Sequence, residues 1–163
     1  MKRFIYAGGE FITDDATADA LMDYASVLAI VNSADVVRFP GIDDYRRMRE
    51  ASGLSAKSAA AAGRGLANTT YGVSLLRDGE VVGMGRIVGD GGCFHFVVDI
   101  AVVPALQGRG LGKRIMDALD AWLRANAEPG AHVSLFADGD AKHLYARYGF
   151  AQSDKSVGMF YRV

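Results

Sequence analysis

The chain has 163 residues, enough for one domain with a single apolar core and too few for two ordinary domains. Half of the residues are apolar and 23% are charged, which is the balance of an ordinary globular protein. Because the formal net charge is only −1, no overall field draws the protein to nucleic acid or to an anionic membrane.

The first part of the sequence predicts one helix and one strand. Residues 1–13 look irregular, with Gly8-Gly9 as a break. Residues 14–31 predict a helix that is capped by an aspartate and carries its apolar side chains on one stripe. A short strand over residues 34–39 should follow.

The middle of the chain predicts two helices followed by a β-hairpin. The helices cover residues 43–51 and 55–66, and the strands cover residues 69–77 and 80–87. Asp78-Gly79 joins the two strands and is a strong signal for a tight hairpin turn.

The next strand, over residues 94–103, should lie at the centre of a sheet, because FHFVVDIAVV is apolar at nearly every position. The rest of the chain predicts a helix, a strand, a second helix and two short strands: 110–127, 133–136, 140–148, around Phe150, and 159–163. This order predicts an α/β fold with a mixed, mostly antiparallel central sheet and helices on both faces.

The single cysteine, Cys93, cannot form an internal disulfide, which suits a reducing cytoplasm. It shares no metal-ligand spacing with His95, His132 or His143, so we expect no metal site. The apolar run over residues 27–31 is too short to span a bilayer, and the acidic stretch before it is unlike a secretory signal. The cytoplasm is therefore the expected location.

The most informative stretch, residues 102–114, joins a buried strand to the start of a helix and has glycines at 108, 110 and 112. A helix N-terminus exposes unpaired N–H groups and the positive end of the helix dipole, and glycines let phosphate oxygens approach that backbone. Lys113 and Arg114 favour the same interpretation, because basic residues in a first turn oppose the dipole unless an anion binds. Alternatively, the glycines only allow close packing and the basic side chains are solvated.

Two other phosphate motifs do not fit this stretch. The dinucleotide fingerprint would need glycine in place of Lys113. A P-loop would need glycine in place of Gln107 and a hydroxyl residue in place of Arg114.

Two motifs in the chain resemble those of the GNAT N-acetyltransferase superfamily. Gln107-x-x-Gly110-x-Gly112, preceded by Asp99-Ile100-Ala101-Val102-x-Pro104, resembles its pyrophosphate-binding motif Q/R-x-x-G-x-G/A. Ala141-x-x-Leu144-Tyr145-x-x-Tyr148-Gly149-Phe150 is similar to its A-x-x-[LF]-Y-x-x-x-G-F motif. The resemblance covers about residues 34–163 and implies an N-acetyltransferase domain there. Residues 1–33 would then be an extension packed on the domain or at a homodimer interface.

The resemblance implies that acetyl-CoA lies in a V-shaped split between the fourth strand, which ends at Val103, and the fifth, over residues 133–136. The residues it assigns to acetyl-CoA are Ile100, Ala101, Val102, Gln107, Gly108, Arg109, Gly110, Leu111, Gly112, Lys113, Asp138 and Tyr145. Asp138 stands where the family often has Asn, and an Asp side chain cannot donate a hydrogen bond to pantetheine.

Acetyl transfer needs a neutral amine, a stabilised oxyanion and help for the leaving sulfur. Asp99 is the candidate base, because a lone carboxylate within an apolar strand should have a raised pKa; alternatively, backbone N–H groups or an arginine such as Arg86 tie it down. Tyr145 is the candidate acid, implied by the family motif to face the sulfur, whereas Tyr148 on the same helical stripe should only pack in the core. A backbone N–H near Val102 would stabilise the oxyanion.

The acceptor is expected to be a small primary amine, in a pocket built from the helices over 43–66, the strand over 69–76 and the final strands. Four basic residues could recognise an acidic acceptor or form a solvated helix face: Arg46, Arg47, Arg49 and Lys57. The alternatives to small-molecule acetylation are acetylation of protein lysines or N-termini and a non-catalytic CoA-binding module on the same fold. No nucleic-acid or membrane partner is expected.

Overall fold

The computed structural model describes residues 2–6, 9–13 and 40–161, and the chain divides into two compact units, Met1–Val37 and Arg38–Val163. In the first unit, β1 (Lys2–Tyr6) pairs antiparallel with β2 (Gly9–Thr13). The prediction that residues 1–13 are irregular is therefore wrong for residues 2–6 and 9–13, which contain several β-favouring aromatic and β-branched residues. The predicted helix over 14–31 and strand over 34–39 lie outside the described residues.

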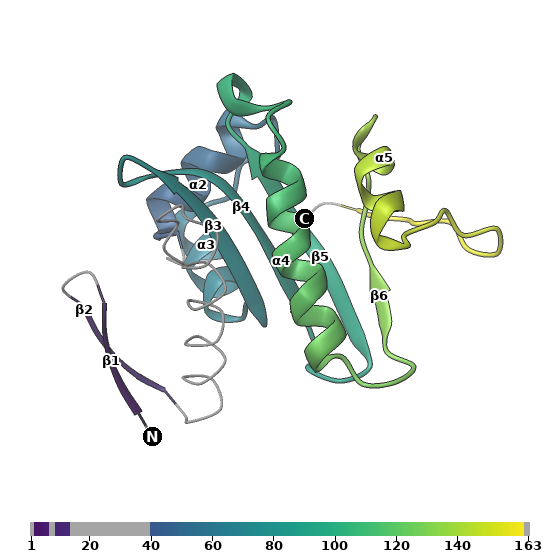
Figure 1. Ribbon diagram of the computed structural model, residues 1–163, viewed down its shortest axis with the longest axis horizontal. Coiled ribbons are helices and arrows are strands. Elements are labelled where there is room, and N and C mark those ends of the chain that lie inside the picture. The colour runs from purple at the N-terminus through teal and green to yellow at the C-terminus, as the bar shows by residue number, and fades with distance from the viewer. Residues whose placement is uncertain (1, 7–8, 14–39, 162–163) are drawn as a thin grey trace. The chain divides into compact units, whose positions relative to one another are not determined.

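The second unit is built on a four-stranded sheet of order β3-β4-β5-β6 (Figure 1). Its strands are β3 (Tyr71–Arg77), β4 (Glu80–Gly89), β5 (Phe94–Val102) and β6 (His132–Ser134). The first three run antiparallel, and β6 pairs in parallel with β5. The predicted mixed α/β sheet, with the long apolar strand in its interior, is confirmed.

The β3–β4 turn is the predicted hairpin. Asp78 and Gly79 have φ values of 53° and 82°, as a two-residue turn with both central residues left-handed requires. Glycine meets this requirement without strain, and aspartate is one of the few other residues that tolerate it.

Helices cover both faces of the sheet (Figure 1). On one face, α2 (Ile42–Ala51) packs over β4 and β5, and α3 (Ala59–Ala67) packs against α2. On the other face, α4 (Leu111–Asn126) packs over β3, β4 and β5. The predicted second helix begins at residue 59 rather than 55, because Ser58 is its cap and accepts a hydrogen bond from the Ala61 N–H. Among the described residues, no helix is long and apolar enough to cross a membrane.

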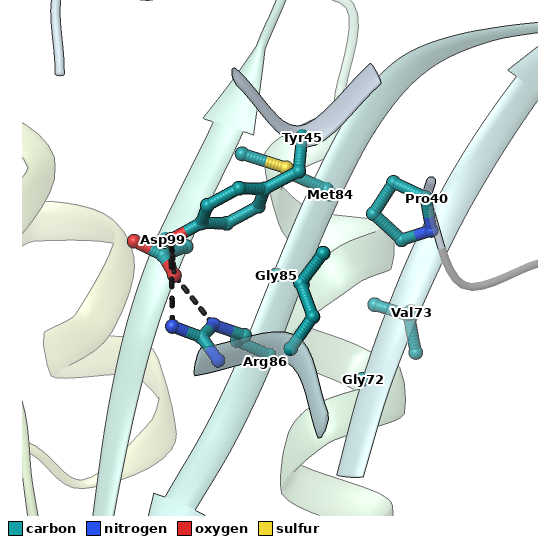
Figure 2. A pocket seen from close by; sticks show the side chains of 9 residues that line it. Pro40, Tyr45, Gly72, Val73, Met84, Gly85, Arg86 and Asp99 are labelled. Carbon is teal, nitrogen blue, oxygen red and sulfur yellow. Dashed lines mark hydrogen bonds and ion pairs between the residues drawn. The ribbon is translucent and has the colours of Figure 1, made fainter. Parts of the chain in front are cut away.

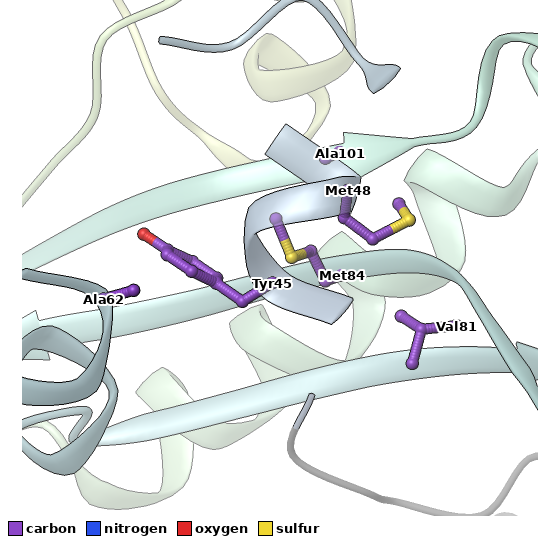
Figure 3. Close-up of a cluster of buried hydrophobic side chains, with 6 residues drawn as sticks. All are labelled: Tyr45, Met48, Ala62, Val81, Met84 and Ala101. Atoms are coloured by element: carbon purple, nitrogen blue, oxygen red, sulfur yellow. The ribbon is translucent and has the colours of Figure 1, made fainter. Parts of the chain in front are cut away.

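Successive residues of β4 point to opposite faces of the sheet, so β4 contributes to the packing on both faces. Met84 joins the core under α2 and α3, together with Tyr45, Met48, Ala62, Val81 and Ala101 (Figure 3). Its neighbour Gly85 faces α4 instead, where an added Cβ would stand 2.5 Å from a methyl carbon of Ile115. Glycine at position 85 therefore lets α4 lie close against the sheet.

The C-terminal part contains α5 (Ala141–Tyr145) and the short helix η2 (Ala146–Tyr148), which ends at Gly149 with a φ of 87° as predicted. The two predicted strands after it are wrong for residues 150–161, where no strand forms. The tail offers apolar residues, but β6 is only three residues long and presents little edge to pair with. The large apolar side chains of Val157, Met159, Phe160 and Tyr161 are therefore exposed.

Candidate active site

A β-bulge interrupts β5 at Asp99. The register runs from Arg86↔Val98 to Met84↔Ala101, so Asp99 and Ile100 together oppose Gly85. Asp99 has a φ of 58°, in the left-handed region that non-glycine residues rarely adopt. Bulges and strained residues of this kind often redirect side chains at functional sites. The sequence did not reveal the bulge, because both faces of β5 are apolar and one inserted residue leaves no break in the pattern.

The Asp99 carboxylate is buried between two arginines and a tyrosine. It forms ion pairs with Arg49 of α2 and with Arg86 of β4, whose Nε lies 2.5 Å from Oδ2. The Tyr45 hydroxyl donates to the same Oδ2 at 3.0 Å (Figure 2). Burial and then the negative charge of Asp99 raise the pKa of Tyr45, so its hydroxyl stays protonated and able to donate. The geometry is that of the arginine-tied carboxylate, one of the two alternatives the sequence left open.

The two guanidinium groups are held by further hydrogen bonds on the face of the sheet that α2 covers. Arg49 donates to the Ser55 carbonyl at 2.8 Å and to the Ser55 hydroxyl at 3.0 Å. Arg86 donates to the Gly65 carbonyl at 2.7 Å and to the Thr69 hydroxyl at 3.0 Å. Sequence reasoning named Arg49 only as one of four basic residues on the 43–66 segment, and here its side chain is buried rather than solvated.

A small pocket that is open to solvent adjoins this cluster (Figure 2). It is lined by Pro40, Tyr45, Leu66, Gly72, Val73, Met84, Gly85, Arg86 and Asp99. The lining residues lie on α2, α3, β3, β4 and β5, apart from Pro40, which precedes α2. The first three of these elements are among those expected to build the acceptor pocket. The final strands were also expected to contribute, but none of the described residues 150–161 lines it.

The turn before α4 forms an open cradle. Gly108 and Gly110 have φ values of 72° and 81°, and no atom lies within 4 Å of where a Cβ would stand on either. Gly110 precedes the helix, and no side chain caps it there. The first turn of α4 therefore has N–H groups without a side-chain cap, next to a glycine turn with open space around it. This arrangement has room for an anion and fits the pyrophosphate of CoA. Lys113, one of the predicted cradle bases, forms an ion pair with Asp117 at 2.8 Å.

The β6-facing edge of β5 is open beyond its first three residues. Pairing with β6 ends at Phe96↔Ser134, although β5 continues to Val102. Because the Val103 N–H donates to the Val82 carbonyl of β4, alternation directs the Val102 N–H away from β4. The Val102 carbonyl accepts from the Gln107 side chain at 3.0 Å, which ties the cradle to the strand end.

The second motif packs against the first. Leu144 of α5 lies 3.4 Å from where a Cβ on Gly112 would stand, and α4 contacts α5. Tyr145 is buried, with its ring edge-on to Phe150 at 6.4 Å between centroids. Burial, and then the negative charge of the exposed Asp138, raise the pKa of the Tyr145 hydroxyl.

Tyr148 differs from its prediction. It is only half-buried, and its hydroxyl donates to Asp117 Oδ1 of α4 at 2.7 Å. Core packing was predicted from the helical stripe, but the helix changes to η2 after Tyr145, which alters the direction of the later side chains.

Comparison with known proteins identifies the class. The pattern of the GNAT acetyltransferase domain matches residues 69–152, about half of the chain and the part that carries both motifs. The chain therefore belongs to the GNAT acetyltransferase family.

Relatives agree with this assignment. An uncharacterized N-acetyltransferase of Pyropia yezoensis is 33% identical over 101 residues, covering 59% of this chain and 57% of the relative. Serotonin N-acetyltransferase 2, chloroplastic, of Oryza sativa subsp. japonica is 36% identical over 86 residues, covering 52% of this chain and 42% of the relative. The match thus spans about half the length of these curated relatives.

A solved structure extends the likeness to most of the domain. A probable acetyltransferase of unknown function from meticillin-resistant Staphylococcus aureus is 35% identical, with a TM-score of 0.75. The likeness covers 78% of this chain and 97% of that protein. The GNAT-like fold is therefore confirmed.

Proposed function

We propose that this protein moves an acetyl group from acetyl-CoA to a primary amine, with both substrates bound at once and the amine attacking directly. The observation that carries the proposal is the open Gly108–Gly110 turn, which leads into an uncapped helix against which α5 packs. When bound, acetyl-CoA supplies an acetyl group on a thioester that an amine can attack.

The cradle would hold the pyrophosphate through the backbone N–H groups from Gly108 to Lys113, including those of Arg109 and Leu111. The open edge of β5 would pair with the pantetheine arm through Ile100, Ala101 and Val102, within the split expected between β5 and β6. The early end of pairing at Phe96↔Ser134 supports this placement, because it leaves main-chain groups of β5 available. The Val102 N–H, directed away from β4, is suited to stabilise the oxyanion.

Tyr145 would donate a hydrogen bond to the leaving sulfur as negative charge develops there. Its raised pKa keeps the hydroxyl protonated, which suits a donor and disfavours a base. The negative charge of Asp138 would help to keep the Tyr145 hydroxyl protonated, because it raises the pKa of that hydroxyl.

We assign Asp99 an orienting role, among the roles of base, orienter and structural carboxylate that the sequence left open. Both of its oxygens are engaged by Arg49, Arg86 and Tyr45, so no oxygen is held ready for the amine proton. The proton would then leave through water, or the amine would arrive already neutral.

The acceptor would be a small amine with an apolar body, lodged in the pocket beside the Tyr45 ring and Met84. Arg86 and Asp99 line the pocket, and Arg49 behind them pairs with the same carboxylate, so the cluster has two positive charges and one negative charge. This balance disfavours a second positive charge on the acceptor and hence a polyamine. The rice relative, named for serotonin, supports trying arylalkylamines first.

The test is a screen of the full chain with acetyl-CoA, detecting free thiol, against arylalkylamines, amino acids, polyamines, amino sugars and lysine peptides. We expect thiol release that depends on a small amine. Release with peptides alone would favour protein acetylation. CoA binding by calorimetry without release for any amine would favour the non-catalytic module.

A further inference from the structure

Side chains from two elements converge on one carboxylate at the bulge of β5. Tyr45 and Arg49 stand one helical turn apart on α2, and Arg86 comes from β4 (Figure 2 shows Tyr45, Arg86 and Asp99). The side chains of Arg49 and Asp99 are each 8% exposed and that of Arg86 is 14% exposed, so solvent screens these ion pairs little.

The carboxylate is attached to the strained residue of the bulge. Asp99 is left-handed in φ, and Ile100 beside it shares the single partner Gly85. A conformation of this kind persists only where its surroundings hold it. The side chain of Asp99 is bound by two charged groups, Arg49 and Arg86, and this attraction opposes relaxation of the bulge into a regular strand.

The bulge lies directly before the open edge of β5. Relaxing it would shift the register by one residue, and a shift of one residue reverses which side each N–H and side chain faces. The groups affected are those of Ile100, Ala101 and Val102. The arginines are themselves fixed, Arg49 on Ser55 and Arg86 on Gly65 and Thr69, so they can serve as rigid supports.

We propose that Arg49 and Arg86 are positioning residues: by holding the Asp99 carboxylate toward α2, they maintain the bulge and so direct the Ile100 and Val102 main-chain groups toward the acetyl thioester. This rests on the proposed acetyl transfer. It assigns the four-group cluster of Tyr45, Arg49, Arg86 and Asp99 a role in aligning the reaction as well as in stability.

The experiment compares Arg49→Met and Arg86→Met with Arg77→Met, which removes an arginine from an ion pair with Asp78 that is 61% and 93% exposed. Three quantities are measured well below each unfolding temperature: kcat with the best amine of the screen, the Kd for CoA, and the ¹⁵N–¹H shifts of Ile100 and Val102. We expect kcat to fall about 10²-fold at either cluster arginine, as small misplacements near reacting atoms do. The Kd for CoA should rise by a smaller factor than kcat falls, because the cradle around the pyrophosphate is unchanged and only the pairing with the pantetheine arm is disturbed. Both amide shifts should move. Arg77→Met should change none of these quantities.

Conservative variants keep the proposal falsifiable if a methionine variant does not fold. Arg86→Lys keeps the charge and loses the planar fork, and Tyr45→Phe loses only the hydroxyl bonded to Asp99. Each should lower kcat less than Arg86→Met and move the Ile100 shift in the same direction. The proposal would be overturned if folded variants had lower unfolding temperatures but kept the wild-type kcat and the wild-type amide shifts. The cluster would then serve only to stabilise the fold. Failure of the wild type to acetylate any amine would instead overturn the proposed function, while the amide shifts would still report on the bulge.

Discussion

The Tyr148 hydroxyl lies 2.7 Å from Asp117 Oδ1 and 3.1 Å from the Lys113 carbonyl oxygen, and so joins η2 to the start of α4. Burial acts to raise the pKa of Asp117, but hydrogen bonds from Lys113 and Tyr148 outweigh it and leave that pKa lowered. The contact holds the helix that carries Tyr145 against the helix that carries the cradle. The two GNAT motifs are thus linked by a tyrosine expected only to fill the core.

Tyr148→Phe should lower the free energy of unfolding by about 1 kcal/mol, the usual net contribution of one hydrogen bond, as measured by urea denaturation. Because the folded state lowers the pKa of Asp117, the pair stabilises the protein above the unfolded pKa, and this is lost as the pH falls through the folded value. Tyr148→Phe should therefore weaken the loss of stability in acid. The exposed Tyr161→Phe is the control, and equal stability of both variants would show that the contact contributes nothing.

Gly110→Val should weaken CoA binding, because a side chain at this position would fill the space open to phosphate. Gly130→Val is the matched control: Gly130 has a φ of 87° and equally open surroundings, but lies in the turn before β6. Both variants should lose about 1–2 kcal/mol of stability from the left-handed backbone. Calorimetry should show weaker CoA binding only for Gly110→Val, and equal affinities would remove the cradle assignment.

The parts of this fold that are encoded locally could be predicted from the sequence. Asp78-Gly79 determines the β3–β4 turn through the backbone preferences of two residues, and the periodic apolar stripe of α4 places it within about a residue at either end. The glycine turn before α4 could also be predicted, because glycines at alternate positions are a local feature of the sequence.

The cluster around Asp99 could not be predicted in the same way. Arg49 and Asp99 are 50 residues apart, and nothing in the composition of α2 distinguishes Arg49 from the nearby arginines 46 and 47. Only the helix phase, which buries Tyr45 and Arg49 one turn apart, could have indicated it. The tail was mispredicted for a related reason, since a strand needs a partner edge as well as β-favouring residues.

Asp99→Asn should lower kcat by the same factor at every pH, because an orienting carboxylate cannot be replaced by hydroxide. The loss of a base could be compensated, because at higher pH more of the amine substrate is already neutral in solution. The variant should also lose about 3–5 kcal/mol of stability, because two buried arginines lose their counter-charge. The control is Asp78→Asn, also left-handed in φ but 93% exposed at its side chain, which should change neither quantity. Recovery of Asp99→Asn activity at alkaline pH would return Asp99 to the role of base.

Tyr145→Phe should lower kcat by about 10²–10⁴-fold, the range for a lost acid or hydrogen-bond donor. The Phe ring keeps the edge-on packing on Phe150, so the unfolding temperature and the Kd for CoA should stay near those of the wild type.

The pH dependence of Tyr145→Phe separates its role from that of an amine base. Because the raised pKa keeps the Tyr145 hydroxyl protonated below its ordinary value near 10, the wild type should keep this donor over the assay range. The defect should therefore be the same at every pH and should not recover in alkali, since it concerns the leaving sulfur and not the amine. The exposed Tyr161→Phe is the control and should keep wild-type kcat. A wild-type kcat for Tyr145→Phe would show that the hydroxyl takes no part in catalysis and that Tyr145 only packs on Phe150.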